Sequence, residues 1–119
     1  MDRKAQYHRD RLNDALRDEI GAILEGELAD PRIGLATVSQ VELSPDGRSA
    51  HVLIAVDEDD TAAEQTLEGL AAAKGYIRHE VAERLHLRHA PDFIFRLDRS
   101  QRVGARIDEL LKRINQRSK

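Results

Sequence analysis

The sequence predicts a small α+β domain in which helices pack on one face of a three-stranded sheet. Two β-rich runs meet at a short turn, a third follows a proline, and apolar residues recur at helical spacing around them. The expected order of elements is α-β-β-α-kink-α-β-α. With 119 residues the chain is expected to form a single domain over residues 1–119, with flexible ends at 1–8 and 115–119.

The first helix is predicted from Leu12, because apolar residues recur at intervals of three and four as far as Leu28. A proline disfavours helical geometry in the residue before it, so the helix is expected to stop at Asp30. Asp30, Pro31 and Arg32 then form a turn motif that leads into the first strand.

The strands are predicted from three β-rich runs. LATVSQVEL and SAHVLIAV are joined by SPDG, whose proline and glycine suit a type I turn, so they predict an antiparallel hairpin. The first run changes phase between Val38 and Val41, where a bulge is expected. The third run, PDFIFRLD, places Phe93, Phe95 and Leu97 on one face.

The second helical region contains a glycine that needs an explanation. The stretch TAAE at 61–64 is a capping box, and apolar residues recur at helical spacing on both sides of Gly75. A glycine in a helix interior costs roughly 0.5–1 kcal/mol relative to alanine. We therefore predict a kink at Ala73 and Gly75, whose freed N–H groups could face a phosphate beside Lys74. The alternative is a kink that only fits the helix around the sheet.

A last helix is predicted after Ser100, with an apolar stripe of Val103, Ile107, Leu110, Leu111 and Ile114. At 100° per residue, four of its arginines fall within a sector of about 60°: Arg102, Arg106, Arg113 and Arg117. Such a row can reach successive phosphates through paired N–H donors. The alternative is a solubilising flank with local ion pairs to Asp108 or Glu109.

Charge is distributed unevenly along the chain. Residues 1–71 carry 7 Lys+Arg and 16 Asp+Glu, a net of −9, whereas residues 72–119 carry 12 and 6, a net of +6. This split suggests a basic face that meets a polyanion and an acidic face held away from it. The alternative is a solvated surface on which the signs happen to segregate.

Composition also bears on compartment. The sequence has no cysteine, so disulfides and thiolate sites are excluded, and a reducing compartment is favoured. No apolar run approaches the roughly 20 residues that a membrane-spanning helix needs, and the N-terminus has no apolar region typical of a signal peptide. A cytoplasmic protein with no membrane partner is expected.

Motifs for catalysis are weak. The acidic run DEDD at 57–60 could bind Mg²⁺ in a nuclease, but four consecutive carboxylates repel one another instead of converging on an ion. His86 and His89 could share a metal, but no cysteine and no clear third ligand accompany them. The chain has no G-x-S-x-G, P-loop or G-x-G-x-x-G motif. We expect no enzyme, no metal and no cofactor.

Three blocks resemble the bacterial ribosome-binding factor A family over nearly the whole chain: EIGAILEGELADPRIG, VSQVELSPDGRSAHVLIAV and AAAKGYIRHEVAERLHLRHAPDFIFRLDRS. The most specific parts are the turn at 30–32, the Ala-x-Gly element at 73–75 and the strand after Pro91. The resemblance implies a type II KH-like domain with a three-stranded mixed sheet. In this fold a helix-kink-helix replaces the G-x-x-G loop of ordinary KH modules, and this sequence has no G-x-x-G.

The resemblance implies a monomeric ribosome biogenesis factor that binds the free 30S subunit. Its implied role is to assist late maturation and processing of 16S ribosomal RNA, including adaptation to cold, through contacts with RNA backbone and shape. Small-subunit ribosomal proteins and an assembly GTPase are further implied partners. The contact candidates in this chain are Lys74, Arg78, Arg84, Arg88, Arg102, Arg106 and Arg113.

A second hypothesis uses the opposite charge. In it the protein is an interaction module that binds a basic partner, such as a ribosomal protein, through the acidic hairpin side. The residues of that side are Glu42, Asp46 and Asp57 to Asp60.

Overall fold

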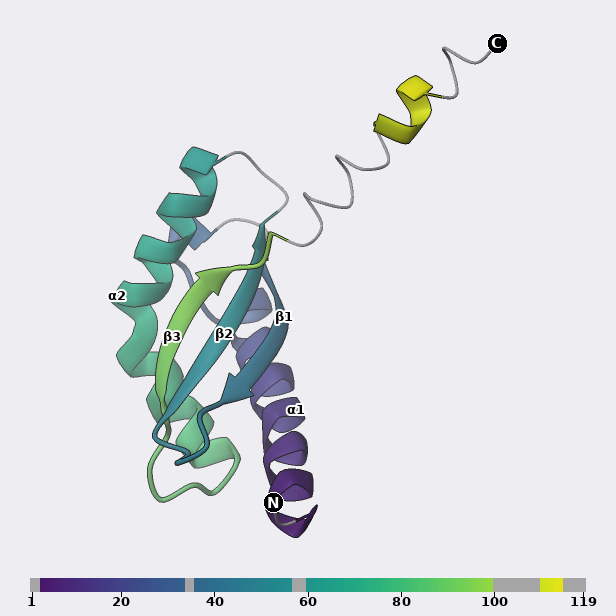
Figure 1. Ribbon diagram of the computed structural model, residues 1–119. Coiled ribbons are helices and arrows are strands. Elements are labelled where there is room, and N and C mark those ends of the chain that lie inside the picture. Colours follow the sequence, from purple (N-terminus) through teal and green to yellow (C-terminus); the bar gives the residue numbers. More distant parts are fainter. Residues whose placement is uncertain (1–2, 34–35, 57–59, 100–109, 115–119) are drawn as a thin grey trace.

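A computed structural model describes residues 3–33, 36–56, 60–99 and 110–114. The strands follow the spatial order β1-β2-β3, with β1 antiparallel and β3 parallel to β2. The prediction of an α+β fold with a three-stranded mixed sheet is therefore confirmed. The elements, shown in Figure 1, are α1 (Arg3–Gly26), the 3-10 helix η1 (Pro31–Ile33), β1 (Ala36–Leu43), β2 (Ser49–Val56), α2 (Asp60–Arg84) and β3 (Asp92–Leu97).

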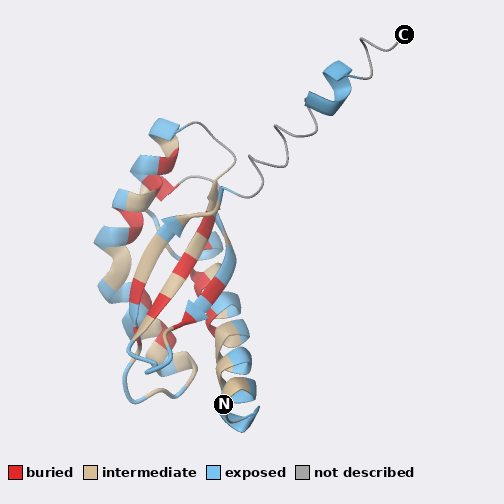
Figure 2. Ribbon diagram, in the orientation of Figure 1, coloured by how far each residue is buried: buried red, intermediate tan, exposed pale blue. Residues whose placement is uncertain are grey.

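The helices α1 and α2 cover the same face of the sheet (Figure 1), as predicted. Every second residue of β2 points into the core that they enclose, and Ala50, Val52 and Ile54 are fully buried. The residues between them, such as His51 and Leu53, face the other side and are only half-buried. Figure 2 shows this alternation along the central strand.

The predicted hairpin is confirmed in detail. The register of β1 against β2 shifts between Val38 and Gln40, where the phase of the sequence changes. In the connecting turn Gly47 N donates to Ser44 O at 2.9 Å, and Gly47 has a φ of 73° that favours glycine. Asp46 Oδ1 accepts hydrogen bonds from Ser44 Oγ at 2.6 Å and from Arg48 N at 3.0 Å.

The helix α2 runs continuously from Asp60 to Arg84, so the chain does not leave helical structure at Ala73 and Gly75, and a kink of the helix axis there stays a prediction. Leu70 and Ile77 are fully buried on one continuous stripe, which passes beside the glycine. Burying one such side chain contributes about 1.5–3 kcal/mol, which exceeds the roughly 1 kcal/mol cost of the glycine. The backbone N–H groups near Lys74 therefore remain inside the helix.

The glycine that packing requires in α2 is Gly69. A Cβ added there would lie 2.6 Å from Ile33 Cγ1, whereas a Cβ added at Gly75 would meet nothing within 4 Å. Thr66, one turn earlier, has its hydroxyl 3.2 Å from Arg32 O, which also connects α2 to η1. The small residue thus allows η1 to dock closely on the first half of α2.

The helix α1 differs from its prediction at both ends. It begins at Arg3 instead of Leu12, so residues 3–8 of the expected flexible end are helical. Side-chain hydrogen bonds of Gln6 with Arg9 and Asp10, at 3.2 and 3.0 Å, support these polar turns. It ends at Gly26 instead of Asp30, because the chain turns there and Leu28 packs against the core.

The last predicted helix is described only over residues 110–114, which are helical. Its apolar side chains Leu110, Leu111 and Ile114 are 56%, 53% and 58% exposed. Arg102, Arg106 and Arg117 lie outside the described residues, as do residues 57–59 of the acidic run. Arg113 lies within them and is exposed.

Candidate nucleic-acid interface

The loop that joins α2 to β3 begins with a left-handed residue. His86 has a φ of 54°, a conformation that histidine adopts more readily than most residues. Leu87 N donates to Ala82 O at 2.8 Å, the pattern of a Schellman helix end. This turn directs the following residues back along α2 toward the start of β3.

Three of the predicted contact residues, Lys74, Arg78 and Arg88, lie around this loop. Lys74 and Arg78 are about one turn apart on α2. Arg78 donates from Nε to Pro91 O at 3.1 Å and from a terminal nitrogen to Ala90 O at 3.0 Å. Arg88 is exposed and precedes these two carbonyls by a few residues. Arg78 therefore holds the loop against the helix, and the same hydrogen bonds fix the position of its own guanidinium group.

The β1–β2 hairpin adds a fourth cation, Arg48, which sequence reasoning missed. Asp92 N donates to Arg48 O at 2.9 Å, and Asp92 Oδ1 lies 3.4 Å from Lys74 Nζ. Asp92 thus connects the hairpin, α2 and β3. The parallel pairing of Ser49 with Asp92 brings Arg48 close to Lys74 and the start of β3. Only knowledge of that strand pairing could have placed Arg48 at this site. We call Arg48, Lys74, Arg78 and Arg88 the basic junction.

The basic junction keeps an excess of positive charge. Two carboxylates contact it. The carboxylate of Asp92 lies beside Lys74. The carboxylate of Asp46 has a lowered pKa, chiefly because of the hydrogen bond from the Ser44 side chain and also because of the one from the Arg48 backbone. Four cations against two carboxylates leave a net charge of 4 − 2 = +2. Arg48 and Arg88 are exposed, so their guanidinium groups can accept an anion from solvent.

Arg84, another predicted contact residue, has a different environment. Its guanidinium lies 3.5 Å from Glu80, 3.7 Å from Glu19 and in direct hydrogen-bond contact with Glu27. Glu27 also accepts a hydrogen bond from the Tyr76 hydroxyl at 3.1 Å. The hydrogen bond from Arg84 lowers the pKa of Glu27, and that same bond raises the pKa of Arg84. Arg84 joins α1 to α2 and is surrounded by negative charge.

The turn motif at 30–32 also has a structural function. Asp30 accepts hydrogen bonds from the Arg32 backbone N at 2.9 Å and from its guanidinium at 2.6–3.1 Å. The side-chain bonds, followed by the backbone bond, lower the pKa of Asp30 to about 2. This clamp shapes η1, whose Ile33 is buried against Gly69.

Metal and membrane sites find no support in the described part of the chain. Over residues 3–33, 36–56, 60–99 and 110–114 no three His, Asp or Glu side chains gather so that they could hold a metal ion. Within the same residues, none of the helices has the length and apolar character to span a bilayer.

Comparisons with known proteins agree with the predicted resemblance. A family model described as ribosome-binding factor A matches residues 8–111. A Koribacter versatilis (strain Ellin345) protein named ribosome-binding factor A is 62% identical over 117 residues, covering 98% of this chain and 95% of that protein. A Thermomicrobium roseum protein of the same name is 44% identical over 110 residues, covering 92% and 85%.

Solved structures give the same result. The crystal structure of ribosome-binding factor A from Thermus thermophilus matches with a TM-score of 0.68 at 27% identity, covering 77% of this chain and 98% of that one. A homology model of the Thermus thermophilus factor, fitted into a cryo-EM map of a 30S–RbfA complex, has a TM-score of 0.57 at 32% identity and covers 77% and 92%. This chain therefore belongs to the ribosome-binding factor A family.

Proposed function

We propose that this protein is a non-catalytic ribosome biogenesis factor that binds the free 30S subunit and assists late maturation of 16S ribosomal RNA, including in the cold. Family membership supports the proposal, as does the relative whose homology model is fitted into a map of a 30S complex. In this chain one observation carries it: cations from the hairpin, α2 and the α2–β3 loop converge on the basic junction.

The convergence matters because the fold fixes the elements that carry these cations. Asp92 and the Arg78 hydrogen bonds connect the three elements, so the backbone positions of the cations are set before an RNA arrives. Phosphate contacts position a protein on RNA without reading sequence, and each one releases counterions. If all four cations reach phosphates, the logarithm of the binding constant should fall with the logarithm of salt concentration with a slope of about −3 to −4.

The acidic hairpin side offers no comparable convergence within the described residues. The Asp46 carboxylate is used within its own turn by Ser44 and Arg48 N, and residues 57–59 lie outside the described ranges. The RNA-binding hypothesis is therefore favoured over the protein-interaction hypothesis.

Co-sedimentation with isolated 30S, 50S and joined 70S particles across a salt series tests the proposal. We expect selective, salt-sensitive pelleting with 30S, which the double variant Arg48→Glu with Arg88→Glu should strongly weaken. Arg17→Glu is the matched control, because Arg17 is also an exposed arginine but lies on α1 beside Asp14 and Asp18. Equal weakening by the control, or no binding to 30S at low salt, would contradict the proposal.

The triple reversal of Arg102, Arg106 and Arg113 to glutamate, in the same assay, tests the predicted arginine row of the C-terminal segment. A loss of 30S binding here, with none in the Arg48/Arg88 variant, would move the proposed interface from the basic junction to that segment. Depletion of the protein should, in addition, cause 16S precursor RNA to accumulate, with a larger effect at low temperature.

A further inference from the structure

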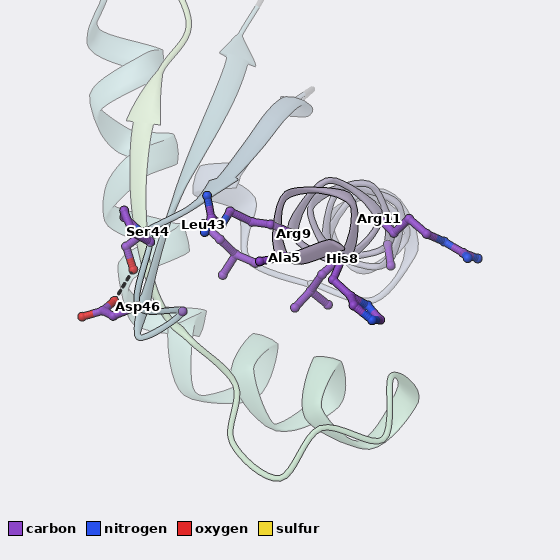
Figure 3. A pocket seen from close by; sticks show the side chains of 11 residues that line it. Ala5, His8, Arg9, Arg11, Leu43, Ser44 and Asp46 are labelled. Carbon is purple, nitrogen blue, oxygen red and sulfur yellow. Dashed lines mark hydrogen bonds between the residues drawn. The ribbon is translucent and has the colours of Figure 1, made fainter. Parts of the chain in front are cut away.

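An open pocket lies between the first turns of α1 and the β1–β2 hairpin (Figure 3). Its volume is about 620 Å³, within the range of small-molecule sites. Leu43 N donates to Asn13 Oδ1 at 2.9 Å, a hydrogen bond that fixes the hairpin against α1. The pocket is lined by Ala5, His8, Arg9, Arg11, Leu12 and Ala15 of α1 and by residues 43–47 of the hairpin.

The pocket has two kinds of lining. Apolar side chains come from both walls, with Leu12 on α1 and with Leu43 and Pro45 on the hairpin. The cationic group on the hairpin side of the helix is Arg9, which points toward Leu43 and Ser44, whereas Arg11 points away from the hairpin (Figure 3). On the hairpin side the carboxylate of Asp46 is hydrogen-bonded to Ser44, as the dashed line shows.

The surroundings of the pocket strengthen its positive charge. Residues 3–11 contain four Lys+Arg and one Asp, a net of 4 − 1 = +3, although they belong to the acidic half of the sequence. The guanidinium of Arg11 lies 5.7 Å from the centre of the Tyr7 ring, and this ring is 62% exposed. Tyr7 is not among the residues that line the pocket, so this ring adds no stacking surface there.

The pocket adjoins the basic junction. Gly47 lines the pocket, and the next residue, Arg48, belongs to the junction. A single strand that crosses the hairpin tip could therefore contact both sites. Apolar walls beside cations match the two parts of a nucleotide, because a base packs on apolar or aromatic groups while its phosphate pairs with arginine.

We propose that this pocket binds an unpaired nucleotide of the small-subunit RNA, with its base against Leu12, Leu43 and Pro45 and its phosphate on Arg9. The inference rests on the proposed function and extends it from backbone contacts to a single-stranded element. An acidic peptide is the competing occupant, and the experiment separates the two.

The test is an NMR titration of ¹⁵N-labelled protein with a mixed-sequence single-stranded RNA hexamer and with the corresponding duplex. We expect saturable shifts of residues 5–15 and 43–47 with the single strand and weaker ones with the duplex. Arg9→Ala should weaken binding of the hexamer about tenfold or more, because a charged hydrogen bond contributes about 1.5–3 kcal/mol. Arg17→Ala, on the same helix, should leave it unchanged.

Several outcomes would overturn the inference. They are chemical shift changes that the Arg9→Ala substitution leaves unaltered, equal changes with the duplex, and tighter binding of a glutamate-rich peptide at the same residues. Alanine has the highest helix propensity, so the Arg9→Ala variant should fold, and Arg9→Gln provides a second variant. Wild-type protein that pellets with 30S but does not bind the hexamer would refute only this pocket, whereas failure to pellet would refute the proposed function.

Discussion

The two halves of α2 are held in the molecule by different kinds of contact. The first half packs sterically, with Gly69 so close to Ile33 that a single added methyl group would collide with it. The second half is held by charge. Arg84 reaches one carboxylate from α1, one from α2 and that of Glu27, which follows α1, and Arg78 binds the carbonyls before β3.

The difference separates residues that serve the fold from residues that remain available to a partner. In the first half nothing in the sequence indicates that Gly69 matters more than Gly75, and packing decides it. Arg84 is the last residue of the second half, and Arg88 follows four residues later in the α2–β3 loop. Arg84 lies among carboxylates, whereas no hydrogen bond or ion pair engages the Arg88 side chain within the described ranges.

The largest expected effect comes from a methyl group added to the first half. Gly69→Ala places a Cβ 2.6 Å from Ile33 Cγ1, so η1 or α2 must move. Overpacking costs about 1–3 kcal/mol, and the helix propensity of alanine offsets about 1 kcal/mol. We expect the free energy of unfolding, measured by urea denaturation, to fall by up to about 2 kcal/mol.

Gly75→Ala is the matched control in the second half. Because nothing lies within 4 Å of the added Cβ, we expect the free energy of unfolding to rise by about 0.5–1 kcal/mol. In an Ile33→Ala background the colliding atom is absent, so Gly69→Ala should cost clearly less than in the wild type. Equal losses for the two glycine variants would remove the distinction between the halves.

A smaller effect is expected from the charged contacts of the second half. Arg84→Gln leaves the carboxylates of Glu19, Glu27 and Glu80 without their shared cation, so the melting temperature should fall. The loss should change with added salt, which screens these charges. Arg88→Gln should leave the melting temperature unchanged and weaken 30S co-sedimentation. If Arg84→Gln instead weakened binding at unchanged stability, Arg84 would belong to the interface.

The smallest effect is a pH dependence at the docking site of the first half. The pKa of Asp30 falls to about 2 from an ordinary value of 3.8, chiefly through hydrogen bonds from Arg32. Because the pKa of Asp30 is lower in the folded state, this stabilisation is complete at pH values above the pKa of the unfolded chain. It is lost as the pH falls toward 2. The melting temperature of Asp30→Asn should therefore lie below wild type at pH 6 and converge with it near pH 2. A constant difference across this range would contradict the assignment.

The outcomes for the fold follow the range of the interactions involved. The turn SPDG, the bulge near Val38 and the alternating burial of β2 were predicted correctly, because each depends on neighbouring residues or on strand periodicity. The ends of α1 were predicted wrongly, because they depend on packing, as where Leu28 packs against the core after the helix has ended. The continuity of α2 past Gly75 also depends on packing, through the buried stripe that contains Ile77.

The candidate site divides in the same way. The sequence by itself determined the basic character of residues 72–119, the absence of known catalytic motifs from the sequence and the family resemblance. These are properties of composition and of the order of neighbouring residues. Only the tertiary structure decided that Arg48 joins Lys74, Arg78 and Arg88, and that Arg84 does not. Distances between charges on separate elements depend on how strands pair and helices dock, and these contacts join residues far apart in the chain.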